Sequence, residues 1–122
     1  MNKICIALLL TLSVACMVEA PNFFEGPGNK ALSGKGNHAL GRDNTFDGNL
    51  NEAIGSENKI SGDQNYVVGD ENEVEGDSND IEGDMNDIFG QKNYVSGEGN
   101  MVRGSNNLVM GGNNNVNSLS DE

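Results

Sequence analysis

A chain of 122 residues has room for one domain, and 19 Asp and Glu against 7 Lys and Arg give it a formal net charge of −12 at pH 7. This charge excludes nucleic acid and anionic membrane surfaces as partners, because both would repel the protein. High net charge with few large apolar side chains is by itself typical of disorder, so an ordered fold has to come from a repeating pattern.

The first twenty residues are typical of a secretory signal peptide. Lys3 supplies a positive start, residues 4–14 are apolar, and residues 18–20 (Val-Glu-Ala) match a small-x-small cleavage site. The apolar stretch is too short for a membrane span. We therefore expect residues 1–20 to be removed and the protein to be secreted and extracellular, in the apoplast or cell wall if it comes from a plant, without membrane contact afterwards. An uncleaved anchor and a lipoprotein modified at Cys16 remain as alternatives.

Residues 21–33 are expected to form an N-terminal cap. Phe23, Phe24 and Pro27 lie here, and the repeat that follows is out of register by one residue at Ser33. A stack of strands needs covered ends, because an open end offers unpaired strand edges. Both cysteines of the chain precede this segment, so no disulfide can stabilise the fold.

From residue 34 to 117 the pattern Gly-x-x-Asn-x-(aliphatic)-x repeats every seven residues. The Asn positions are Asn37, Asn44, Asn51, Asn58, Asn65, Asn72, Asn79, Asn86, Asn93, Asn100, Asn107 and Asn114. Two residues after each Asn comes Ala39, Phe46, Ala53, Ile60, Val67, Val74, Ile81, Ile88, Val95, Val102, Val109 or Val116. Three positions kept in phase over this length are a specific signal of a repeat architecture.

The repeat predicts strands and excludes a coiled coil. A coiled coil needs two apolar positions per seven residues, whereas this repeat has one, together with Gly and Asn, which are poor helix formers. In Asn-x-Val-x-Gly the Asn and Val side chains face one way, and Gly allows a tight corner. We predict an all-β fold, a small β-solenoid (β-roll) of about six 14-residue coils, each made of two heptads, with inner ladders of Val/Ile and of Asn.

Residues 118–122 break the pattern and are expected to form an acidic C-terminal tail. They have little apolar bulk, so this end of the stack is expected to be less well covered. That leaves end-to-end or face-to-face association of two copies open.

The side chains one and three residues after each Asn should point outward, and alternate heptads should contribute to opposite faces. One of these faces carries an apolar set that would project into solvent: Leu40, Ile54, Tyr66, Val68, Tyr94, Leu108 and Met110. Exposed contiguous apolar surface usually marks a contact site, so these residues are the predicted binding surface. The alternative is packing between neighbouring strands without a ligand.

Catalysis and metal binding have little support in the sequence. The chain has one His, no cysteine after residue 20 and no Gly-x-Ser-x-Gly motif. The acidic run from Asp70 to Asp87 could hold Ca²⁺, but mutually repelling carboxylates that keep the protein soluble are the favoured explanation. We expect no enzyme activity, no cofactor and no metal.

The repeat resembles that of the ice-recrystallisation-inhibition (antifreeze) proteins of grasses, written x-x-Asn-x-Val-x-Gly. Residues 70–76 (DENEVEG) and 105–111 (SNNLVMG) match it at every fixed position, and the similarity covers about residues 34–117. The resemblance implies a β-roll with internal Val and Asn ladders and flat outer rows that bind ice. It therefore suggests an ice surface as the partner.

Two further functions stay open at this stage. One is an extracellular or cell-wall interaction protein that binds a protein or polysaccharide through the face bearing Tyr66 and Tyr94. The other is a secreted effector recognised by a receptor. The outward positions contain a single Thr, Thr45, and this favours the first of these two over ice.

Overall fold

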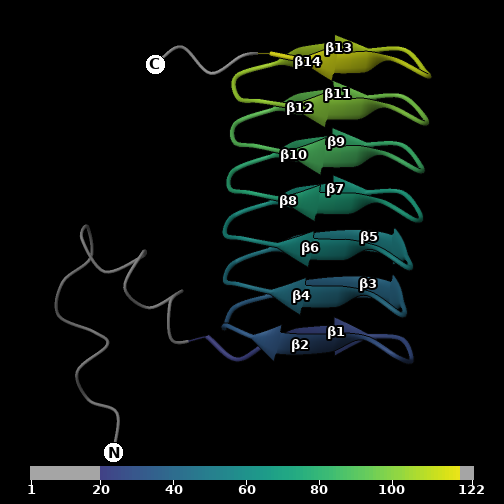
Figure 1. The fold of residues 1–122 in the computed structure, drawn as a ribbon. Coiled ribbons are helices and arrows are strands. Elements are labelled where there is room, and N and C mark those ends of the chain that lie inside the picture. The colour runs from purple at the N-terminus through teal and green to yellow at the C-terminus, as the bar shows by residue number, and fades with distance from the viewer. Residues whose placement is uncertain (1–19, 119–122) are drawn as a thin grey trace, which may run out of the picture.

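The computed structural model describes residues 20–118, which form a stack of seven coils (Figure 1). Each coil contributes one strand to each of two parallel seven-stranded sheets, which we call sheet A and sheet B. Sheet A consists of β1 (Phe23–Glu25), β3 (His38–Arg42), β5 (Glu52–Ser56), β7 (Tyr66–Val68), β9 (Asp80–Glu82), β11 (Tyr94–Ser96) and β13 (Leu108–Met110). Sheet B consists of β2 (Lys30–Ser33), β4 (Thr45–Asp47), β6 (Lys59–Ser61), β8 (Glu73–Glu75), β10 (Asp87–Phe89), β12 (Met101–Arg103) and β14 (Asn115–Asn117).

The apolar position of each heptad forms the core between the two sheets. From Ala39 to Val109 every residue at this position is at most 5% exposed, and Phe24, Ala31 and Val116 pack against the ends of the cluster. One coil cannot bury its own apolar face, so this core exists only because neighbouring coils stack. The all-β solenoid and the inward direction of the Val/Ile ladder are confirmed.

The repeated Asn side chains form two continuous hydrogen-bonded ladders. Asn72 is typical: its Nδ2 donates to Oδ1 of Asn58 one coil earlier at 3.0 Å and to the backbone oxygen of Gly83 at 2.8 Å. Its own Oδ1 accepts from the backbone N and the Nδ2 of Asn86, both at 3.0 Å. Because every polar group is paired, these amides can be buried without the penalty of an unsatisfied donor or acceptor.

Each corner contains two residues with positive φ. One is the repeated Gly, and the other is the residue just before each Asn, which has φ between 56° and 61° in ten cases although it is not Gly. At Gly76 an added Cβ would lie 1.8 Å from the backbone oxygen of Gly90 in the next coil. This position therefore requires Gly for space as well as for φ, whereas the residue before Asn points outward and can vary.

The segment expected to be a cap forms the first coil of the stack. Strand β1 pairs with β3 and β2 with β4, and Asn22 and Asn29 bond to Asn37 and Asn44 as the later Asn residues do. The register shifts between Ala31 and Ser33, so the extra residue is Leu32, which is exposed. This insertion hides the first two heptads from a strict seven-residue search, and the stack has seven coils where about six were predicted.

Residues 1–19 and 119–122 lie outside the described part of the chain. The predicted signal peptide, except Ala20, and the predicted acidic tail, except Ser118, therefore fall outside it. Within residues 20–118 no helix is long and apolar enough to cross a membrane.

Candidate binding face

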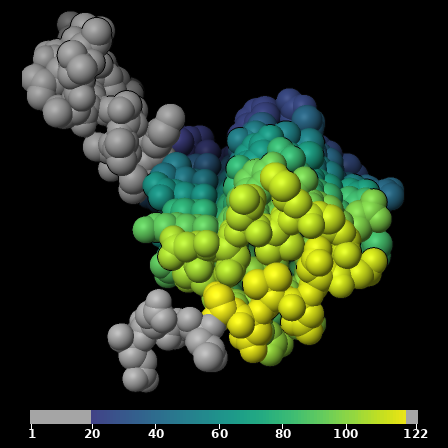
Figure 2. All heavy atoms as spheres, turned by 90° about the horizontal axis from the view of Figure 1, so that it is seen from above, coloured from purple at the N-terminus to yellow at the C-terminus, as the bar shows by residue number. Residues whose placement is uncertain are grey.

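The outward positions of sheet A form two parallel columns that run along the stack. We call the residues one after each Asn column A1: Phe23, His38, Glu52, Tyr66, Asp80, Tyr94 and Leu108. The residues three after each Asn are column A2: Glu25, Leu40, Ile54, Val68, Glu82, Ser96 and Met110. Because the strands are parallel and in register, equivalent side chains repeat at the strand spacing of about 4.8 Å. Viewed along the stack, the coils lie behind one another (Figure 2).

All seven residues of the predicted binding surface lie on this face, but they do not form one patch. Leu40, Ile54 and Val68 are consecutive in column A2, with Tyr66 beside Val68 on β7. Tyr94, Leu108 and Met110 lie on β11 and β13, the last two strands of sheet A. The two groups are separated by β9, whose outward residues are acidic. Leu108 and Met110 are each 69% exposed, while Ile54, Val68 and Tyr94 are half-buried by their neighbours.

The acidic strand β9 shares an electrostatic feature with β10 of sheet B, where Asp87 Oδ1 is also inaccessible and has no hydrogen-bond partner among residues 20–118. The Oδ1 atom of Asp80 is inaccessible and has no hydrogen-bond partner among residues 20–118. Burial raises the pKa of the Asp80 carboxyl above its usual range, and the negative charge of Glu82 raises it further. Beside it, the Tyr94 hydroxyl donates a hydrogen bond to Oε2 of Glu82 at 3.3 Å, and the charge of Glu82 raises the pKa of Tyr94. This strand therefore presents carboxylates that are incompletely satisfied by the protein.

Towards the N-terminus, column A1 carries a ring contact and a polar contact. The His38 ring stacks on Phe23 with centroids 5.4 Å apart. Its Nδ1 atom lies 3.4 Å from Oε1 of Glu52 in the next coil. The His38 ring is thus stacked on its neighbour with the ring planes inclined by 26°, and its Nδ1 atom faces a carboxylate.

The outer face of sheet B is more highly charged. Its outward positions carry seven charged side chains, Lys30, Asp47, Lys59, Glu73, Glu75, Asp87 and Arg103, against four on sheet A, Glu25, Glu52, Asp80 and Glu82. Lys59 Nζ bonds to Glu73 Oε1 at 2.5 Å, and this contact raises the pKa of Lys59. The Arg103 guanidinium lies 5.5 Å from the centre of the Phe89 ring. Charged groups hold their hydration water strongly, so this face is less suited to an uncharged solid surface.

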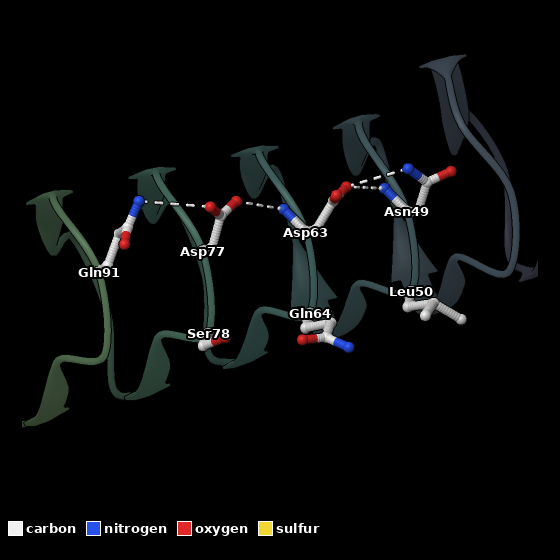
Figure 3. A pocket seen from close by; sticks show the side chains of 7 residues that line it. All are labelled: Asn49, Leu50, Asp63, Gln64, Asp77, Ser78 and Gln91. Atoms are coloured by element: carbon white, nitrogen blue, oxygen red, sulfur yellow. Dashed lines mark hydrogen bonds between the residues drawn. The ribbon is translucent and has the colours of Figure 1, made fainter. Parts of the chain in front are cut away.

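A groove runs along the corner that follows the sheet B strands (Figure 3). Asn49, Asp63, Asp77 and Gln91 lie in one column there. Asp63 Oδ1 accepts from the backbone N of Asn49 at 2.7 Å, and Asp77 Oδ1 accepts from the backbone N of Asp63 at 2.9 Å. The acidic side chains expected to repel one another therefore also hold successive corners together. In residues 20–118 no group of three or more His, Cys, Asp or Glu is placed to hold a metal ion.

Comparison with known protein families settles the class of this β-roll. A family model described as the grass antifreeze beta roll matches residues 23–118, from the first strand of the first coil to the residue after the last strand. The chain belongs to the grass antifreeze β-roll family. No curated protein sequence matches the chain.

Membership of the antifreeze β-roll family confirms the resemblance found in the repeat and extends it by one coil. The match begins at Phe23, ahead of residue 34 where the unbroken repeat was found. It therefore includes the segment shifted by Leu32. A search that allowed one inserted residue would have found Asn22-x-Phe24 and Asn29-x-Ala31 as two more heptads.

Proposed function

We propose that this antifreeze β-roll protein binds ice and inhibits ice recrystallisation through the outer face of sheet A. The observation that carries the proposal is the family match over all seven coils. The choice of sheet A over sheet B rests on the charge difference between the two faces. Column A2 supplies the longest uncharged run, formed by Leu40, Ile54 and Val68 on three successive strands.

Binding to the face of an ice crystal requires a protein surface that is flat, periodic and weakly hydrated. Parallel in-register strands place each row of side chains at a constant spacing. Apolar side chains release their hydration water at little cost, so the row in column A2 can meet ordered water without first displacing tightly held solvent. The protein also lacks rows of repeated Thr in residues 20–118, so the aliphatic groups take the place that hydroxyl-bearing side chains would have.

We further propose that the protein is secreted, is cleaved after Ala20 and acts without catalysis. The first twenty residues have the order of charge, apolar run and small residues that signal peptidases recognise. Mass spectrometry of the protein recovered from the medium of a secreting host should give a chain that begins at Pro21. Retention of residues 1–20 in the cell-associated fraction would contradict this part of the proposal.

The ice proposal is tested by a recrystallisation assay on purified residues 21–122 with a pair of matched variants. Ile54→Asp places a charge in column A2, and Ser61→Asp places the same charge on sheet B at the equivalent position of the next strand. Both sites are half-buried, and neither side chain enters the core. We expect inhibition by the wild type, its loss in Ile54→Asp and its retention in Ser61→Asp. No inhibition by a folded wild-type protein would refute ice binding, and loss in Ser61→Asp alone would assign it to sheet B.

A further inference from the structure

Column A1 alternates between flat rings and carboxylates along five successive coils. The order is His38, Glu52, Tyr66, Asp80 and Tyr94, which lie on five successive strands of sheet A. Successive rings are therefore two coils apart, or about 10 Å at the strand spacing of a sheet. A carboxylate lies midway between each pair of rings. No other column of outward side chains in residues 20–118 has this period.

Apart from the contact of His38 with Glu52, the carboxylates of columns A1 and A2 have no basic partner among residues 20–118. Columns A1 and A2 contain no Lys or Arg, and the one basic residue in the strands of sheet A other than His38 is the exposed Arg42 at the end of β3. Asp80 has an oxygen without a hydrogen bond, and Glu82 beside it is contacted only weakly by the Tyr94 hydroxyl at 3.3 Å. Around them the chain carries no Lys or Arg between Lys59 and Lys92, while acidic residues are frequent. The face thus attracts cations and repels anionic polymers.

We infer that column A1 binds a linear β-1,4-linked amino-sugar polymer, laid along the axis of the stack. Apolar faces of pyranose rings pack on aromatic rings, and Tyr combines such a surface with a polar group. In a β-1,4-linked chain each sugar is turned by half a revolution relative to the last, so the same face recurs every second unit. A site with one ring every two coils has this same alternation.

The amino group distinguishes the proposed ligand from other β-1,4-linked polymers of the same shape. A protonated amine on the sugar forms charge-assisted hydrogen bonds with carboxylates, which are stronger than bonds to neutral groups. Glu52 and Asp80 lie between the rings, where the intervening sugar units would be. Polyuronates of the same geometry would meet like charge on this face.

This inference does not rest on ice binding, although both use the outer face of sheet A. Ice contact is assigned to the aliphatic residues of column A2, and sugar contact to the rings and carboxylates of column A1. Variants in the two columns therefore separate the two activities. A protein that binds the polymer without inhibiting recrystallisation would retain this inference and lose the ice proposal.

The test is calorimetric titration of residues 21–122 with three soluble β-1,4-linked hexasaccharides: glucosamine, N-acetylglucosamine and glucose. The titrations are made at a pH near 6, where the amines are protonated. We expect binding of the glucosamine hexamer and markedly weaker binding of the two neutral ones. Tyr66→Ala with Tyr94→Ala should reduce the affinity about tenfold or more, while Tyr66→Phe with Tyr94→Phe should restore most of it. Asp80→Asn should also weaken binding of the charged hexamer.

Matched controls on sheet B exclude general attraction between a polycation and an acidic protein. Phe89→Ala removes an aromatic ring, and Glu75→Gln removes a carboxylate, both from outward positions of that sheet. Each should change the affinity by less than about twofold, as expected for exposed charges and distant side chains. Equal losses in the sheet A and sheet B variants would overturn the inference, as would equal affinity for the charged and neutral hexamers or no binding of the glucosamine hexamer.

Discussion

The ring of Phe24 stacks on the ring of Phe46 inside the solenoid, with centroids 5.6 Å apart and planes inclined by 9°. The two residues belong to opposite sheets and to adjacent coils. Each Phe shares its own coil with a small residue at the facing core position, Ala31 with Phe24 and Ala39 with Phe46. In the first two coils a large side chain thus faces a small one across the core, and the large one lies on alternate sheets. In a closely packed core of this kind, a change in the volume of one side chain affects stability.

Truncation of Phe46 should therefore be strongly destabilising. Phe46→Ala would face Ala39 across the core and leave a cavity that the rigid stack cannot close. We expect the free energy of unfolding to fall by about 3–5 kcal/mol, measured by urea denaturation of residues 21–122. Phe89→Ala, which removes the same ring from the outer face of sheet B, should cost much less. Similar losses in the two variants would show that Phe46 does not fill a sealed core.

Each internal Asn side chain of the ladder should stabilise the contacts of its coil with both neighbouring coils. Asn72→Ala removes the donors to Asn58 and Gly83 and the acceptor for Asn86. Buried partners would be left without hydrogen bonds, so we expect a loss of about 2–4 kcal/mol in urea denaturation. The exposed Asn115→Ala on β14 is the control and should have little effect. A loss in Asn72→Ala below that of the control would mean that water replaces the ladder bonds.

The two corner positions should respond in opposite directions to substitution. Gly76→Ala would force a Cβ against the Gly90 oxygen, and we expect a loss of about 2 kcal/mol or more. Glu71, with φ of 58°, is an L-residue held in the left-handed region. Glu71→Gly should relieve this strain and raise the free energy of unfolding by about 0.5–1 kcal/mol. Urea midpoints that move in the same direction for both variants would contradict this assignment of the corner.

The raised pKa of Asp80 gives a prediction for pH. A carboxyl whose pKa is higher in the folded than in the unfolded protein binds its proton more tightly when folded, so its contribution to stability falls as pH rises through the unfolded pKa of about 3.9. Above the folded pKa the destabilisation is complete. Asp80→Asn should therefore raise the thermal midpoint at pH 7 and change it little at about pH 3. Glu71→Gln, on an exposed corner, is the charge-matched control. An equal gain at both pH values would show that desolvation of the Asp80 charge is not the cause.

The core and the faces of this protein could be predicted from its sequence because one heptad determines them repeatedly. Asn72 and Val74 face inward for the same reason as every equivalent pair, so the pattern predicts the whole stack. The first coil was missed because Leu32 shifts its register by one residue. A strict period cannot detect a repeat that contains an insertion.

The details of the candidate site depend on features that a repeat does not encode. All seven predicted surface residues lie on sheet A. They are divided into two groups because a single coil carries Asp80 and Glu82 at the outward positions between them. The unpaired Asp80 oxygen and the Tyr94 contact with Glu82 depend on side-chain rotamers. The left-handed residue before each Asn was not predicted either, because Leu50, Met85 and Lys92 have no shared preference for that backbone conformation.

Most bonds of the Asn ladder join residues 14 positions apart, and this spacing restricts how such a chain can change length. Removing or duplicating 14 residues within the stack, for example 63–76, would rejoin equivalent strands and leave both ladders continuous. A change of one residue in an inner coil would misalign it with two neighbours at once. The inserted Leu32 lies in the first coil, which has to match a neighbour on one side only. Insertions and deletions of one or a few residues should therefore be confined to the terminal coils, and inner coils should be gained or lost whole.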